Sequence, residues 1–162
     1  MVTRGLKLIA GLIILVLSGC GGEAPVEVSV GAKAPAFALQ GLDGQKVKSD
    51  SYDGDLVVLN FWATWCQNCK KELPDLKELA KTTNAKVVGI ALDEGGAKTV
   101  KPFVKKNDIN YTVLIGNERV FNRFKGIAIP YTLVLDREQR IVEIFRGPIP
   151  KGSLEETLKK LS

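Results

Sequence analysis

A buried strand, a tight turn and a helix are predicted within residues 57–74, and two cysteines lie where the turn meets the helix. The run VVLNFW is apolar at five of six positions, as expected of a strand at the centre of a sheet. Cys66 opens the expected helix and Cys69 follows three residues later. Positions three apart share a helix face, so the two sulfur atoms can close a small disulfide. This feature constrains the fold most, because it requires a buried strand that is followed directly by a helix.

The position of Cys66 at a helix N-terminus favours redox chemistry. Unpaired backbone N–H groups and the helix dipole stabilise an anion there, so a thiolate forms more readily than in free cysteine. Cys66 would attack a disulfide, and Cys69 would resolve the mixed disulfide that results. A C-x-x-C pair is also compatible with half a zinc site or a structural disulfide. Zinc needs four ligands, and this pair of thiolates supplies only two.

The run from Asn60 to Pro74, N-F-W-A-T-W-C-x-x-C-x-x-E-x-P, closely resembles the active site of the TlpA/ResA-like branch of the thioredoxin superfamily. The resemblance covers about residues 30–161. It implies an α/β, thioredoxin-like fold: a central mixed β-sheet flanked by helices, with an N-terminal β-hairpin and a central strand/helix insertion.

The order of expected elements agrees with that fold. Asp43-Gly44 supplies the hairpin turn, and the apolar stripe of the helix after Cys66 has helical spacing. Strands are expected at 37–40, 45–48, 56–61, 86–92, 111–115, 131–135 and 141–146. Helices are expected at 67–83, 97–107, 117–125 and 153–161, with Ser153 as a candidate N-cap of the last. Strand 111–115 and helix 117–125 resemble the insertion of this branch.

The resemblance also implies a proline beside the cysteines as part of the catalytic site. This proline is Pro130, which is expected in the cis form after Ile129 and against the disulfide. Pro130 lacks an N–H, which leaves neighbouring backbone free to pair with an extended substrate. Trp65, Gln67, Asn68 and Ile129 are expected to bind the substrate beside the two cysteines. Tyr131 stands where the family usually has Thr, which leaves the shape of the groove open.

Glu72 is the candidate proton carrier. In ResA-like proteins the matching glutamate lies near the thiols, and like-charge repulsion would raise their pKa values. Asn60 occupies the position of a buried aspartate in thioredoxin and cannot take up a proton. The alternative interpretation is that Glu72 only suits the dipole of the first helical turn.

The first thirty residues predict export and a lipid anchor. Arg4 and Lys7 precede ten apolar residues and the sequence Leu-Ser-Gly-Cys, a signal peptide pattern that resembles a bacterial lipobox. The expected organisation is a signal peptide at 1–19, a flexible tether at 20–29 that begins with lipidated Cys20, and one domain at 30–162. The alternative is a plain signal peptide, or an uncleaved anchor, with Cys20 an incidental thiol.

Charge and composition exclude several classes of function. The chain carries 23 Lys and Arg against 18 Asp and Glu, a net charge of +5, and contains no histidine. A histidine-based triad or proton shuttle is therefore impossible. The positive charge is scattered, so we expect no nucleic-acid partner. We expect a monomer with no cofactor beyond its own disulfide and no bound metal.

These features together predict an extracytoplasmic, membrane-anchored thiol-disulfide oxidoreductase that reduces disulfides. The resemblance implies envelope proteins, such as apocytochrome c during cytochrome c maturation, as substrates. It also implies a membrane thiol transporter of the CcdA/DsbD type as electron donor. A thiol oxidase or isomerase on the same scaffold is the main alternative. A peroxiredoxin-like peroxidase is expected to have Thr at position 63, which is Ala here. A metal-carrying lipoprotein is a further alternative, but copper carriers of this fold use C-x-x-x-C and a histidine, whereas this chain has C-x-x-C and no histidine.

Overall fold

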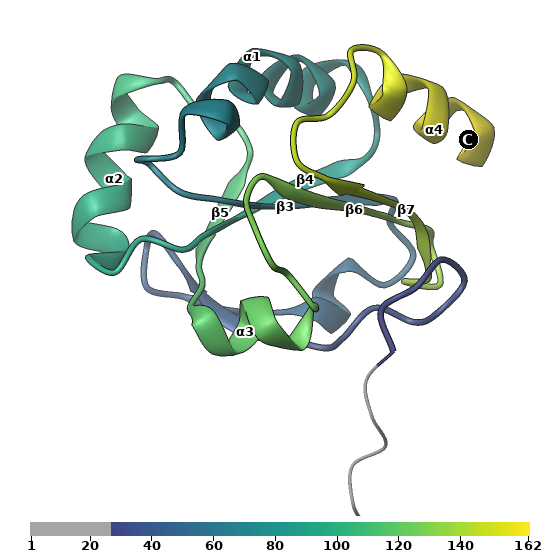
Figure 1. The fold of residues 1–162 in the computed structure, drawn as a ribbon, viewed down its shortest axis with the longest axis horizontal. Coiled ribbons are helices and arrows are strands. Elements are labelled where there is room, and N and C mark those ends of the chain that lie inside the picture. The colour runs from purple at the N-terminus through teal and green to yellow at the C-terminus, as the bar shows by residue number, and fades with distance from the viewer. Residues whose placement is uncertain (1–26) are drawn as a thin grey trace, which may run out of the picture.

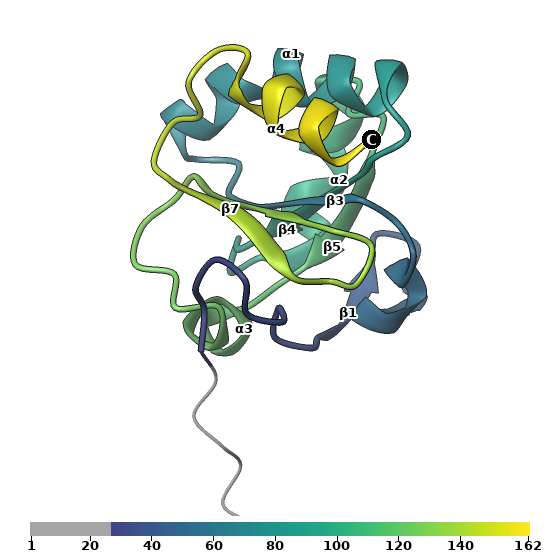
Figure 2. The ribbon, with the colours of Figure 1, turned by 90° about the vertical axis from the view of Figure 1, so that its right-hand side faces the viewer.

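A computed structural model describes residues 27–162 and arranges them in three layers (Figure 1). A seven-stranded sheet forms the middle layer. Helices α1, α2 and α4 cover one face and α3 covers the other, as the turned view also shows (Figure 2), while the N-terminal hairpin extends one edge of the sheet. The predicted mixed sheet flanked by helices, with its N-terminal hairpin, is thereby confirmed.

The sheet has the order β2-β1-β5-β4-β3-β6-β7. The pairs β3–β4 and β4–β5 are parallel, whereas the pairs β1–β2, β1–β5, β3–β6 and β6–β7 are antiparallel. Their bounds are β1 Ala38–Gly41, β2 Lys46–Lys48, β3 Val57–Trp62, β4 Lys86–Ala91, β5 Thr112–Ile115, β6 Tyr131–Leu135 and β7 Ile141–Arg146. Every residue of β3 is buried, as its apolar sequence predicts.

The helices are α1 Gln67–Thr82, α2 Gly96–Lys106, α3 Glu118–Arg123 and α4 Ser153–Leu161, and a 3₁₀ turn covers Ser49–Tyr52. All four expected helices are present, and each end lies within two residues of the expected position. The N-cap prediction for Ser153 is wrong. Gly152 occupies that position with φ +82°, a left-handed conformation that suits glycine, and Ser153 is the first helical residue.

The two faces of β3 contribute to different parts of the core. Val57, Leu59 and Phe61 face α3, whereas Val58 and Trp62 lie with the clusters beneath α1, α2 and α4. This alternation is the period of two expected of a strand. Asn60 belongs to the second face, and it is therefore buried beneath α1.

The predicted signal peptide, Cys20 and residues 20–26 of the tether lie outside the described residues. Val28 already packs against the core, so contacts with the domain begin two residues before the expected start at residue 30. Among residues 27–162, no helix combines the length and the apolar character needed to cross a bilayer.

Candidate functional site

Cys66 and Cys69 form a disulfide where the chain passes from β3 into α1. Their Cα atoms are 5.3 Å apart, and the two residues are only 7% and 2% exposed. Both belong to a buried cluster with Trp62, Ala63 and α2. Cys66 is thus the more exposed residue of the pair.

Cys66 caps α1 through its own side chain. Its Sγ accepts a hydrogen bond of 3.2 Å from the backbone N–H of Cys69. This donor is among the N–H groups that a helix leaves unpaired at its first turn. In the reduced protein the same N–H would stabilise a Cys66 thiolate, together with the positive end of the helix dipole.

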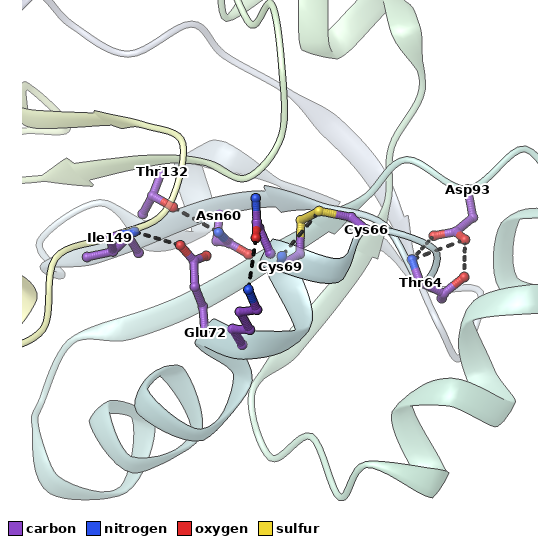
Figure 3. Close-up of a disulfide and its surroundings, with 10 residues drawn as sticks. Asn60, Thr64, Cys66, Cys69, Glu72, Asp93, Thr132 and Ile149 are labelled. Carbon is purple, nitrogen blue, oxygen red and sulfur yellow. Dashed lines mark hydrogen bonds between the residues drawn. A yellow bond between two sulfur atoms is a disulfide. The ribbon is translucent and has the colours of Figure 1, made fainter.

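The turn that presents Cys66 is held by Asp93, in the loop after β4. Both carboxylate oxygens of Asp93 accept hydrogen bonds from the backbone N–H of Thr64, at 3.2 and 3.1 Å, and the Thr64 hydroxyl donates a third. Asp93 is buried, and Figure 3 shows this pair on one side of Cys66. These bonds fix the backbone directly before Trp65 and Cys66.

The cis peptide bond predicted between Ile129 and Pro130 is confirmed. Ile129 packs against the cluster that contains both cysteines, so the loop before β6 lies beside the disulfide. Tyr131 does not enter this groove. Its ring packs on the α3 face against Phe61, and its hydroxyl donates a hydrogen bond of 3.0 Å to the carbonyl of Phe124.

The side chains expected at the rim differ in exposure. Trp65 is 66% exposed, and Gln67 and Asn68 are also exposed between the cysteines. Ile129 is half-buried, whereas Ile127, two residues earlier, is 91% exposed. Ile127 was not among the predicted site residues, because nothing in the sequence tells an exposed isoleucine from a core one.

Glu72 is buried and only 6% exposed, one turn beyond Cys69. Its Oε1 accepts a hydrogen bond of 2.7 Å from the backbone N–H of Ile149, while Oε2 is buried without a hydrogen-bond partner. Burial raises the pKa of Glu72 to about 7, the Ile149 N–H opposes this rise, the charge of Asp75 adds to it, and the nearby Asn60 amide lowers it. Glu72 is therefore a carboxyl group that can both hold and release a proton near neutral pH.

Buried polar residues surround Glu72 on the same face of the sheet. The amide of Asn60 on β3 donates a hydrogen bond of 2.8 Å to the hydroxyl of Thr132 on β6 (Figure 3). Tyr111, just before β5, has a buried hydroxyl without a partner, and burial, followed by the Glu72 charge, raises its pKa. Burial thus keeps this phenol protonated at neutral pH, next to a carboxyl that can exchange its proton.

Some of these contacts could not be found from sequence. Asp93 contacts Thr64, and Ile149 contacts Glu72, across long stretches of sequence. The contact between Asn60 and Thr132 also joins two distant strands, and no sequence motif marks it. Within residues 27–162, no cluster of three or more His, Cys, Asp or Glu side chains could hold a metal ion.

Comparisons with known proteins agree with this geometry. Residues 30–144 match the AhpC/TSA family. The chain is 32% identical to the thiol-disulfide oxidoreductase ResA of Bacillus cereus, over 93% of this chain and 94% of that protein. It is 30% identical to the thioredoxin-like protein YneN of Bacillus subtilis, over 94% and 96%. A thiol:disulfide interchange protein of the thioredoxin family from Chlorobium tepidum superposes with a TM-score of 0.70 at 30% identity, over 80% of this chain and 94% of the other. The predicted thioredoxin-like fold is confirmed.

Proposed function

This chain belongs to the AhpC/TSA family as a ResA-like thiol-disulfide oxidoreductase, and from that premise we propose that it reduces disulfides in proteins of the cell envelope. The observation that carries the proposal is the Cys66–Cys69 disulfide at the N-terminus of α1, beside the cis-proline loop. Gln67 and Asn68 place no positive charge between the sulfurs. This favours a couple that gives electrons over one that strongly takes them.

The reaction follows from the two cysteines. The Cys66 thiolate attacks one sulfur of the substrate disulfide, forms a mixed disulfide and releases the other substrate sulfur as a thiolate. The Cys69 thiolate then attacks the Cys66 sulfur, closes the Cys66–Cys69 disulfide and releases the second substrate thiolate. The substrate gains two electrons and the chain loses them.

Glu72 acts in this scheme as the proton acceptor for Cys69. A thiol must lose its proton before it attacks, and Cys69 is too buried to give that proton directly to water. Glu72 lies on the same helix face one turn away, with a pKa of about 7 that suits proton transfer. Asn60 holds its own hydrogen bond to Thr132 and supplies no carboxylate.

Substrate recognition is assigned to the surface beside Cys66. Trp65, Gln67 and Asn68 would contact the substrate from one side and the Ile129–Pro130 loop from the other. The missing N–H at Pro130 leaves room for an extended chain to pair with neighbouring backbone. We extend the predicted rim to Ile127, since its exposed side chain lies on the same loop.

The setting of the reaction follows from the N-terminal sequence. We assign residues 1–19 to a signal peptide and Cys20 to lipid attachment, so that residues 30–162 work outside the cytoplasm on a membrane tether. A membrane thiol transporter of the CcdA/DsbD type would return electrons to Cys66–Cys69, and apocytochrome c is the expected substrate. Replacing Cys20 by Ala should release the protein from the membrane fraction. Continued membrane association would contradict the lipid anchor.

The midpoint potential of the Cys66–Cys69 couple tests the direction of electron flow. Trp62 and Trp65 flank the site, so tryptophan fluorescence in redox buffers reports the state of the couple. We expect a value well below the roughly −180 mV of an isomerase. A value near the roughly −120 mV of a strong oxidant would make the chain an oxidase instead.

Trapping substrates tests the roles of the two cysteines. Cys69→Ser should accumulate mixed disulfides with envelope proteins, because Cys66 can attack and nothing resolves the product. Cys66→Ser is the matched control and should trap none. Adducts in both variants would contradict the assigned order of attack. Consumption of hydrogen peroxide by the unchanged chain at rates comparable to disulfide reduction would favour the peroxidase alternative.

A further inference from the structure

A narrow crevice opens between α1 and the segment that joins β7 to α4. Its walls include Glu72 and Asp75 from α1, Ile149, Pro150 and Gly152 from the joining segment, and Glu155 from α4. The cavity volume is about 20 Å³. A polar space of roughly 10–15 Å³ is enough for one water molecule, so the crevice can admit water but nothing much larger.

The carboxyl group of Glu72 forms the inner end of this crevice. Its Oε1 is held by the Ile149 N–H, and Oε2 has no partner although the residue is almost fully buried. A buried oxygen without a hydrogen bond is costly, and a water molecule in the crevice would satisfy it. Ile149 lines the crevice, and Figure 3 shows Ile149 on one side of Glu72, with Asn60 and Cys69 on the other.

We propose that Glu72 exchanges its proton with solvent through this crevice, and that Asp75 at the crevice is the positioning residue that sets the pH of this exchange. The inference rests on the proposed role of Glu72 as proton acceptor for Cys69. In the forward step the proton of the Cys69 thiol passes to the Glu72 carboxylate, and the thiolate attacks Cys66. The neutral Glu72 then gives this proton to water in the crevice and returns to its carboxylate form.

The ionisable groups around Glu72 explain why Asp75 has this role. Asp75 lies one helical turn further along α1, lines the same crevice, and its negative charge disfavours ionisation of Glu72. Glu155 adds a second carboxylate from α4. On the inner side, the buried Tyr111 hydroxyl stays neutral, and the buried Cys69 is the thiol that would give its proton to Glu72. Asp75 is the neighbouring charge whose repulsion raises the pKa of Glu72.

The test follows the carboxyl carbon of Glu72 by NMR as the pH of the full-length oxidised chain is changed. Asp75→Asn keeps the shape of the side chain and removes its charge, so the titration midpoint of Glu72 should fall by roughly half a pH unit. Asp75→Leu removes the same charge but places an apolar side chain at the crevice. It should dehydrate Glu72 and leave the midpoint clearly above that of the Asn variant. Glu78→Gln removes an exposed charge of the same helix outside the crevice and should leave the midpoint unchanged.

Two results would overturn the inference. If Asp75→Asn and Glu78→Gln have equal midpoints, Asp75 does not set the pH at which Glu72 exchanges its proton. If Asp75→Asn and Asp75→Leu have equal midpoints, the crevice is not the route by which Glu72 reaches solvent. The pH profile of disulfide exchange, measured in parallel with dithiobis(nitrobenzoate), separates the two proposals. If the NMR midpoints shift as expected while Glu72→Gln leaves that profile unaltered, Glu72 exchanges its proton through the crevice but does not accept the proton of Cys69.

Discussion

Glu72 on α1 accepts a hydrogen bond of 2.7 Å from the backbone N–H of Ile149, a residue 77 positions later in the chain. This bond ties the helix that carries both cysteines to the segment between β7 and α4. Only one carboxylate oxygen is satisfied in this way, and the side chain is buried. The folded protein therefore favours the neutral form of Glu72 up to about pH 7.

The first prediction concerns stability and pH. The pKa of Glu72 is raised from 4.5 to about 7 on folding, so below about pH 4.5 both the folded and unfolded states hold the proton. Between about pH 4.5 and 7 only the folded state keeps it, and the free energy of unfolding falls as the pH rises. Above pH 7 this loss is complete, at up to about 3 kcal/mol.

Urea denaturation of the oxidised protein from pH 4.5 to 8 measures this effect. Glu72→Gln stays neutral at every pH, so the difference in stability between the variant and the unchanged chain should shift in favour of Gln as the pH rises. Glu78→Gln, an exposed position on the same helix, is the control and should show little such trend. Parallel stability curves for the unchanged chain and Glu72→Gln would contradict the raised pKa.

The sequence predicted those parts of the site that depend on local order. The strand before Cys66, the helix after it and the cis bond at Pro130 follow from a continuous motif or from resemblance to one. The partners of that motif are contacts between segments far apart in sequence. Ile149 reaches Glu72 through a backbone N–H, which every residue except proline has, so no side chain at position 149 marks the contact.

Tyr131 shows another limit of sequence reasoning. Its substitution for Thr put the shape of the substrate groove in doubt, but alternation along β6 turns its ring to the α3 face. The misplaced N-cap at Ser153 has a similar cause. Serine is the better cap by side chain, but the left-handed turn at Gly152 moves the helix start by one residue.

The second prediction concerns the turn before Cys66. Asp93→Ala would leave the backbone N–H and the hydroxyl of Thr64 without their acceptor. This should lower the free energy of unfolding of the oxidised protein by about 1–3 kcal/mol. Glu94→Ala, at the exposed neighbouring position, should cost much less. Thermal denaturation gives the stabilities, and hydrogen exchange at the Thr64 amide should accelerate only in Asp93→Ala. An unchanged exchange rate would show that the turn does not need Asp93.

The third prediction compares two tyrosine hydroxyls. Tyr131→Phe removes the hydrogen bond to the Phe124 carbonyl and should cost about 1–2 kcal/mol. Tyr111→Phe removes a buried hydroxyl that has no partner, so stability should stay the same or rise. Chemical denaturation of the two variants at neutral pH measures the difference. A loss in Tyr111→Phe as large as in Tyr131→Phe would mean that the Tyr111 hydroxyl is paired in solution.

The last prediction concerns Ile127 and rests on the proposed substrate surface. This side chain is 91% exposed on the loop that ends at Pro130, so Ile127→Ser removes no core packing and should leave stability within about 0.5 kcal/mol. A substrate chain that lies along this loop would cover the isoleucine, and its loss should raise KM for a protein disulfide several-fold with little change in kcat. The change in KM reports binding, because Ile127 contacts neither sulfur.

Val30→Ser is the matched control for Ile127→Ser. Val30 is 67% exposed and precedes Gly31, whose N–H bonds to Ile141 at the start of β7. Since Tyr131 pairs with Arg146 at the other end of the β6–β7 ladder, Val30 lies at the end of the sheet away from the cis-proline loop. Both variants remove one exposed apolar side chain, but only Ile127→Ser should raise KM. Equal KM values in the two variants would place substrate binding elsewhere than on this loop.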